Sequence, residues 1–178
     1  AGHPALLAVD AIASIGCDEL RMDAWGIDVL VGACQKGLML PPGLAFVWFS
    51  ERAMQRSRSA GLVTPYWDWR PRGTATEFYQ FFGGTAPTAH LHGLRESLDM
   101  ILDEEGLPQV WRRHEALSRA VWAAFDAWRA GGHDIALNIA APGHRGHSVT
   151  AARIGNGGAG RLRRWLEAEA GVTLGIGL

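Results

Sequence analysis

One lysine stands out among the side chains that could do chemistry. Lys36 is the only lysine in the 178-residue chain, and the other sixteen of the 17 basic side chains are arginines. It follows the apolar run at residues 29–32 and precedes the turn signal Pro-Pro-Gly at residues 41–43. An amine in low-dielectric surroundings has a depressed pKa, and the neutral form can make a Schiff base. The alternative interpretation is a surface lysine at a turn.

A carboxylate ends an earlier apolar run. Residues 5–9 read Ala-Leu-Leu-Ala-Val and lead directly to Asp10. Such a run is typical of a strand buried on both faces, and open α/β sheets carry ligands at the carboxyl ends of their strands. Asp10 could therefore contact a ligand through its carboxylate. Alternatively, Asp10 is the N-cap of a helix.

The elements that must position these side chains follow from the apolar pattern. A second buried strand is predicted over residues 28–32, where it delivers Gln35 and Lys36, and a third over residues 43–50. Ser50 is placed to cap a helix at residues 51–59, and residues 61–84 form a long aromatic-rich connection. Two helices follow, one ending at Gly106 and one running from Pro108 to residue 131. The remainder predicts strands at 135–139, 148–154 and 172–174, with a helix at 158–170.

Five blocks occur in an order and spacing that resemble a known family. They read VDAIASIG at 9–16, DAWGID at 23–28, QKGLMLPPGL at 35–44, YWDW at 66–69 and GLRESLD at 93–99. Together they resemble the class V aminotransferase family of fold-type I pyridoxal-phosphate enzymes, most closely the serine–glyoxylate and alanine–glyoxylate aminotransferases. The resemblance covers nearly the whole chain, although it thins after Trp128.

The resemblance implies an α/β fold. Residues 1–130 would be the C-terminal part of the cofactor-binding large domain, with part of its mostly parallel sheet and connecting helices. Residues 131–178 would be part of the small α+β C-terminal domain. Family members are much longer and this chain has no initiator methionine, so the sequence reads as a fragment.

The resemblance also implies roles for particular residues toward pyridoxal 5'-phosphate. Lys36 would hold the cofactor covalently and then move the proton between the substrate and the cofactor. Asp10 would keep the pyridine nitrogen protonated, Ile12 would pack on the ring, and Gln35 would hydrogen-bond near the phosphate or the ring hydroxyl. Thr85 would contact the cofactor phosphate of the neighbouring subunit, although a helix cap or turn residue is the alternative for this threonine.

The expected function is therefore transamination of a small amino acid with glyoxylate or a similar 2-oxo acid, in a homodimer with its active site at the subunit interface. A lyase or desulfurase of the same fold is the first alternative, but desulfurases would carry a histidine where Gln35 stands. An inactive fragment without cofactor is the second. In the resembling family, phosphate-binding and ring-stacking residues lie upstream of this chain, and a substrate-binding arginine lies beyond Leu178. We therefore expect these 178 residues alone not to transaminate.

Composition limits the other classes of function. The chain has a formal net charge of −1 and is 48% hydrophobic, which fits a globular protein and gives no indication of nucleic-acid binding. It has no apolar run of the roughly 18 residues that a membrane span requires, and its first residues lack the basic region of a signal peptide. The two cysteines, Cys17 and Cys34, do not make a disulfide framework, so a cytoplasmic location is expected.

Three further patterns have plainer interpretations. The sequence GNGGAG at residues 155–160 matches a dinucleotide fingerprint, but no acidic residue ends the following strand, so a flexible turn is favoured. The aromatic residues of 61–84 have few basic residues among them, which argues against a nucleic-acid stacking surface. The histidine pairs 90/92 and 144/147 lack the partners of a zinc site, so no metal is expected.

Overall fold

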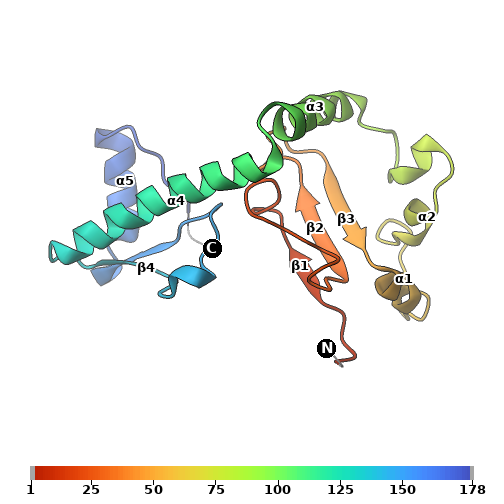
Figure 1. Ribbon diagram of the computed structural model, residues 1–178, viewed down its shortest axis with the longest axis horizontal. Coiled ribbons are helices and arrows are strands. Elements are labelled where there is room, and N and C mark those ends of the chain that lie inside the picture. The colour runs from red at the N-terminus through yellow and green to blue at the C-terminus, as the bar shows by residue number, and fades with distance from the viewer. Residues whose placement is uncertain (1–2, 177–178) are drawn as a thin grey trace. The chain divides into compact units, whose positions relative to one another are not determined.

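The computed structural model describes residues 3–176 (Figure 1). The chain divides into two compact units, the first extending through Val110 and the second beginning at Trp111. This division falls inside helix α4 (Leu107–Ala130) and not at its end. The expected boundary near residue 131 concerns the two domains of the complete protein, and it stays a prediction.

The first unit is built on a three-stranded sheet in the order β1-β2-β3. Strand β1 (Ala8–Asp10) runs parallel to β2 (Val29–Ala33), with Asp10 opposite Val31. Strand β3 (Ala45–Phe49) runs antiparallel to β2. The central strand β2 has the most buried side chains because it has a neighbour on both sides.

Strand β1 corrects one expectation from the sequence. It begins at Ala8 and not at residue 5, and its side chains are exposed or half-buried, not buried on both faces. Leu7, just before the strand, is 47% exposed. Among residues 3–176, β1 is an edge strand that pairs only with β2, so less of the described chain surrounds it than surrounds the central strand.

Most helices that follow the three-stranded sheet occur where the sequence predicts them. Helix α1 (Glu51–Ser57) begins after Ser50, whose hydroxyl accepts the N–H of Ala53 as an N-cap. Helix α3 (Thr88–Asp99) continues into the π-helix η2 (Met100–Glu104), and Gly106, with a φ of 81°, follows shortly after the end of this helical segment. A single helix, α4, then follows. Two short helices that the sequence did not predict, α2 (Arg70–Gly73) and η1 (Phe78–Phe81), interrupt the connection at 61–84.

The larger core cluster of the first unit joins the segment after β2 to the helices. Its buried members come from residues 34–44, from η2 and from the first turn of α4: Cys34, Leu38, Leu40, Leu44, Ile101 and Val110. Leu91 and Leu94 of α3 pack against this cluster. The apolar stripe of α3 is therefore what holds the helix against the chain that leaves β2.

The second unit begins with most of α4 and continues with a two-stranded antiparallel sheet and further helices. After α4 its elements are β4 (Ile135–Leu137), the 3₁₀ helix η3 (Pro142–His144), β5 (Ala152–Ile154), the 3₁₀ helix η4 (Gly155–Gly157) and α5 (Ala159–Glu169). The predicted last strand at 172–174 is wrong, because residues 172–176 adopt no regular structure. Among the described residues, no helix is both long and apolar enough to cross a membrane.

Candidate active site

Asp10 and Lys36 lie at the same edge of the first unit's sheet. Parallel strands point their carboxyl ends in one direction, and Asp10 ends β1 while Lys36 lies three residues beyond the end of β2. The N–H of Ala11 donates to the carbonyl of Val31 at 2.8 Å, which keeps the chain against β2 as it leaves β1. The topology therefore brings the carboxylate and the amine to one edge, where open α/β sheets bind ligands.

Lys36 is carried by the segment between β2 and β3, residues 34–44, here called the lysine loop. Its base is closed by backbone hydrogen bonds from Leu40 N to Cys34 O (3.0 Å) and from Cys34 N to Leu44 O (3.1 Å). The side chain of Lys36 is exposed, so residues 3–176 do not provide the apolar surroundings that the sequence argument assumed. Gln35 is exposed as well, and within the described residues neither side chain makes a hydrogen bond.

Two glycines fix the position of the lysine loop against the turn after β1. A Cβ atom at Gly37 would overlap the carbonyl oxygen of Ile15 and stand 2.8 Å from the sulfur of Cys17. A Cβ atom at Gly16, whose φ is +80°, would stand 3.0 Å from the carbonyl oxygen of Gly37. The residue after Lys36 must therefore be a glycine for the two segments to approach this closely.

Helix α3 supports the lysine loop from the other side. The buried hydroxyl of Ser97 donates to the carbonyl of Leu38 at 2.6 Å, and a ring nitrogen of His90 donates to the carbonyl of Pro42 at 3.0 Å. Figure 1 shows α3 across the carboxyl end of β2. Sequence reasoning missed both supports, because the partners are 59 and 48 residues apart and nothing local signals them.

The carboxylate of Asp10 is exposed and organises the turn that follows it. Its Oδ1 atom accepts the backbone N–H of Ile12 at 2.9 Å. This is the local hydrogen bond of an Asx turn, which resembles the N-cap alternative without starting an assigned helix. No described residue other than Ile12 bonds the carboxylate, so its second oxygen is available to a ligand. Ile12 itself is half-buried beside it.

Thr85 lies apart from these residues within the chain. It is exposed in an irregular segment before α3, and no hydrogen bond of its side chain occurs among residues 3–176. Phe82, three residues earlier, packs against the core cluster that contains Cys34 and Leu38. The structure thus anchors the segment near the lysine loop but shows no contact between Thr85 and Lys36 or Asp10.

A second aspartate near β2 has a structural role. Asp28 is 4% exposed and accepts hydrogen bonds from the N–H of Leu7 (2.9 Å), the hydroxyl of Ser50 (2.9 Å) and the guanidinium of Arg52 (3.1 Å). The Leu7 N–H lowers the pKa of Asp28 most, Ser50 and Arg52 lower it further, and burial opposes them. The ionised carboxylate joins the starts of β1 and β2 to the start of α1.

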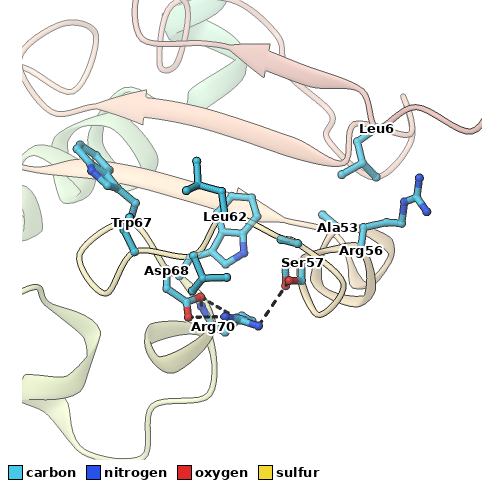
Figure 2. Close-up of a pocket in the computed structure, with 12 residues that line it drawn as sticks. Leu6, Ala53, Arg56, Ser57, Leu62, Trp67, Asp68 and Arg70 are labelled. Carbon is cyan, nitrogen blue, oxygen red and sulfur yellow. Dashed lines mark hydrogen bonds and ion pairs between the residues drawn. The ribbon is translucent and has the colours of Figure 1, made fainter.

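A surface hollow of about 330 Å³ lies elsewhere in the unit, between α1 and the segment 60–70 (Figure 2). None of Asp10, Ile12, Gln35, Lys36 and Thr85 lines it. Its charged group Arg70 is paired with Asp68 at 2.7 Å and directed to the carbonyl of Ser57, as the dashed lines of Figure 2 show. Because none of the candidate residues lines it, the hollow is not part of the candidate site.

The glycine-rich run at 155–160 and His147, for which the sequence favoured no ligand-binding role, have structural roles among the described residues. The run at 155–160 forms η4 and the start of α5, with Asn156 at a φ of 54°, and Gly155 lies directly against the carboxylate of Asp134. His147 stacks on Trp122 at a centroid distance of 5.6 Å. No cluster of metal-ligating side chains occurs among residues 3–176.

Solved structures place this arrangement in a known class of proteins. The chain superposes on an alanine–glyoxylate aminotransferase from Nostoc sp. with a TM-score of 0.78 and 28% identity, covering 97% of this chain and 45% of that one. It superposes on a pyridoxamine–pyruvate aminotransferase from Mesorhizobium loti with a TM-score of 0.80 and 27% identity, covering 98% and 44%. The fold is therefore that of the fold-type I pyridoxal-phosphate enzymes, as the sequence predicts.

The family follows from the sequence match. The model of the class-V aminotransferases matches residues 2–174, and the chain belongs to this family. An L-aspartate–glyoxylate aminotransferase from Paracoccus denitrificans is 45% identical over 130 residues, which are 72% of this chain and 32% of that protein. A serine–glyoxylate aminotransferase from Methylorubrum extorquens is 39% identical over 135 residues, 72% and 33% of the two chains. The chain spans about a third of the length of these curated relatives.

The residues present fit the cofactor that the family implies, pyridoxal 5'-phosphate. The family needs an amine that an aldehyde can reach, and Lys36 is exposed in a loop that is fixed on both sides. It also needs an anion at the neighbouring strand end, and Asp10 has an oxygen that no described residue bonds. The chemistry of this donor set is that of an imine-forming lysine with an aspartate for a pyridine nitrogen.

Proposed function

We propose that the protein to which this chain belongs is a pyridoxal-phosphate-dependent aminotransferase. The observation that carries the proposal is the placement of an exposed aspartate and an exposed lysine beyond the carboxyl ends of two parallel strands, in a chain of the class-V family. When bound, pyridoxal 5'-phosphate supplies an aldehyde for attachment and a ring that withdraws electrons from the substrate Cα.

Lys36, Asp10 and Ile12 have different roles toward the cofactor. The Nζ atom of Lys36 would hold the cofactor covalently. When not bound to the cofactor, the same amine would act as the general base and acid that moves a proton between the substrate Cα and C4′ of the cofactor. The Asp10 carboxylate holds a proton on the pyridine nitrogen, and the hydrogen bond from Ile12 N–H keeps that carboxylate oriented. Ile12 packs on the face of the ring.

Gln35 and Thr85 are assigned to the polar groups of the cofactor. Gln35 precedes Lys36 and is exposed, which suits a hydrogen bond to the phosphate or ring hydroxyl. Thr85 makes no contact with Lys36 within the chain, and we assign it to the phosphate of a neighbouring subunit. This assignment requires a homodimer whose active site lies at the subunit interface, with the exposed aromatic residues of 66–81 at or near that interface.

The substrates are proposed as a small amino acid and a small 2-oxo acid. Glyoxylate recurs in the names of relatives whose amino donors differ, namely aspartate, serine and alanine. We therefore propose glyoxylate as the acceptor, with serine or alanine as donor. A cytoplasmic location accords with the two buried cysteines, Cys17 and Cys34, which form no disulfide among the described residues, and it stays a prediction.

The test is amine transfer by the complete polypeptide. Purified protein is incubated with pyridoxal 5'-phosphate, glyoxylate and one of serine, alanine or aspartate, and glycine formation is followed. The proposal expects glycine with at least one donor, and none when Lys36 is replaced by Ala. Lys36→Arg is the matched control, because it keeps the charge but cannot form the covalent link. Glycine formation at the wild-type rate by both variants would contradict the proposal.

A further inference from the structure

The lysine loop contains a residue in a conformation that its type disfavours. Met39, three residues after Lys36, has a φ of 58°, and Asn156 is the only other non-glycine residue with positive φ among residues 3–176. This region brings the Cβ atom close to the following carbonyl oxygen, and a methionine has no short polar group to compensate. The Met39 side chain is 55% exposed, so its packing does not explain the conformation.

Hydrogen bonds of the loop account for part of this geometry. Met39 N–H donates to the carbonyl of Lys36 at 2.9 Å, and Leu40 N–H donates to the carbonyl of Cys34 at 3.0 Å. Cys34 adds its thiol, which donates to the carbonyl of Pro41 at 3.0 Å. These bonds fix the peptide groups around Met39. In the trans peptide group between Leu38 and Met39, the carbonyl of Leu38 points opposite to the Met39 N–H and needs a hydrogen-bond donor of its own.

That partner is Ser97 of helix α3. Its side chain is 5% exposed, and its hydroxyl donates to the Leu38 carbonyl at 2.6 Å. This carbonyl belongs to the peptide group between Leu38 and Met39, whose orientation relative to the Met39 side chain is what φ of Met39 describes. A relaxed φ at Met39 would rotate the peptide group and move the Leu38 carbonyl away from the Ser97 hydroxyl, so that this buried hydroxyl would lose its hydrogen bond.

We propose that Ser97 is a positioning residue for Lys36. Its hydroxyl holds the Leu38–Met39 peptide group, imposes the left-handed conformation on Met39, and thereby fixes the lysine loop in the form that presents the Lys36 amine at the carboxyl edge of the sheet. The consequence for cofactor attachment rests on the proposed function. The consequence for the loop does not.

Two substitutions test whether Ser97 acts through the hydrogen bond of its hydroxyl or only by filling space. Ser97→Ala removes the donor and leaves nearly the same space filled, so a serine that only packs would tolerate it. Met39→Gly removes the cost of the left-handed conformation, because glycine adopts it freely. A glycine at residue 39 should therefore restore the loop when the Ser97 hydroxyl is absent. Ser118→Ala is the matched control, since Ser118 is 6% exposed and bonds a carbonyl of its own helix.

The experiment measures two quantities in the complete polypeptide. Amide hydrogen exchange of residues 37–44, without cofactor, should be about tenfold faster in Ser97→Ala, as loss of such a bond implies. Attachment of pyridoxal 5'-phosphate to Lys36, measured by borohydride trapping at limiting cofactor, should weaken by a similar factor. Ser118→Ala should change neither quantity. Ser97→Ala with Met39→Gly should recover most of the attachment.

Each outcome decides the proposal. Unchanged loop exchange in Ser97→Ala would overturn it, and so would faster exchange with unchanged attachment, or failure of Met39→Gly to restore attachment. If no variant, including the wild type, attaches the cofactor, the proposed function fails while the exchange result still decides the role of Ser97 in the loop. Should Ser97→Ala not fold, Ser97→Cys, whose thiol is a weak donor, is measured with the same expectations.

Discussion

Gly37 lies with its backbone directly against the carbonyl of Ile15, with no space for a side chain between them. Gly37 follows the lysine that we assign to the cofactor, and Ile15 lies in the turn that follows Asp10. The contact therefore ties the loop after β2 to the turn after β1. It holds the backbone that carries Lys36 beside the turn that follows Asp10.

Gly37→Ala is expected to disrupt this contact. The new methyl group would overlap the Ile15 carbonyl and crowd the sulfur of Cys17, so the two segments must separate. Overpacking of this kind costs about 1–3 kcal/mol of unfolding free energy, and transamination should fall with it. The measurement is urea unfolding of both proteins. Gly61→Ala is the control, because nothing lies within 4 Å of its added methyl group; equal stability of the two variants would refute the prediction.

Asp28 should make the free energy of unfolding depend on pH in the acidic range. Its pKa is lowered in the folded protein, first by the Leu7 N–H, so its contribution to stability is present above the unfolded pKa of about 4 and is lost as the pH falls through the lower folded value. Asp28→Asn should be less stable than wild type at neutral pH, and the difference should shrink in acid. Thermal unfolding from pH 7 to 3 measures both proteins, and a difference that grows on acidification would contradict the assignment.

Ser50→Ala should lose two hydrogen bonds at once. The Ser50 hydroxyl accepts the N–H of Ala53 at the start of α1 and donates to the carboxylate of Asp28. Loss of the cap alone costs about 1 kcal/mol of unfolding free energy. Ser50→Thr, which keeps both functions, should stay near wild type. Urea unfolding of the pair checks the prediction, which fails if the alanine and threonine variants are equally stable.

Asp10→Asn should reduce turnover and leave the free energy of unfolding nearly unchanged. An asparagine oxygen can still accept the Ile12 N–H, so the turn and the unfolding free energy should be nearly unchanged. The neutral amide cannot hold a proton on the pyridine nitrogen, so turnover should fall about 100-fold or more while the cofactor remains attached. Steady-state rates and cofactor content are measured on the same sample. Near-normal turnover would mean that Asp10 is only structural.

Much of the fold could be predicted because its signals are local. Gly106 and Pro108 mark the end of one helical segment and the start of the next, and Ser50 caps α1 as expected. Short elements were less predictable. The helices α2 and η1 within 61–84 have no apolar periodicity to reveal them, and the apolar run at 172–174 pairs with no strand among the described residues.

The candidate site was predictable only in part. Lys36, Asp10 and Gln35 are recognisable from family blocks, and the parallel pairing of β1 with β2 places their segments at one edge. Thr85 was also recognisable, but no contact among residues 3–176 brings it to the other residues. The bond between Ser97 and the Leu38 carbonyl was not predictable, since a serine within a helix has many solvent-exposed alternatives and its partner is 59 residues away.

The central claim is that Lys36 attaches the cofactor, and borohydride trapping tests it most directly. The complete polypeptide is mixed with pyridoxal 5'-phosphate, reduced and digested, and the modified peptides are identified by mass spectrometry. Lys36 is the only lysine of these 178 residues, so within them the position of the label is unambiguous. We predict a stoichiometric label on Lys36 that disappears in Lys36→Ala. An unlabelled Lys36 in a protein that transaminates, or a label that persists within this region in Lys36→Ala, would contradict the claim.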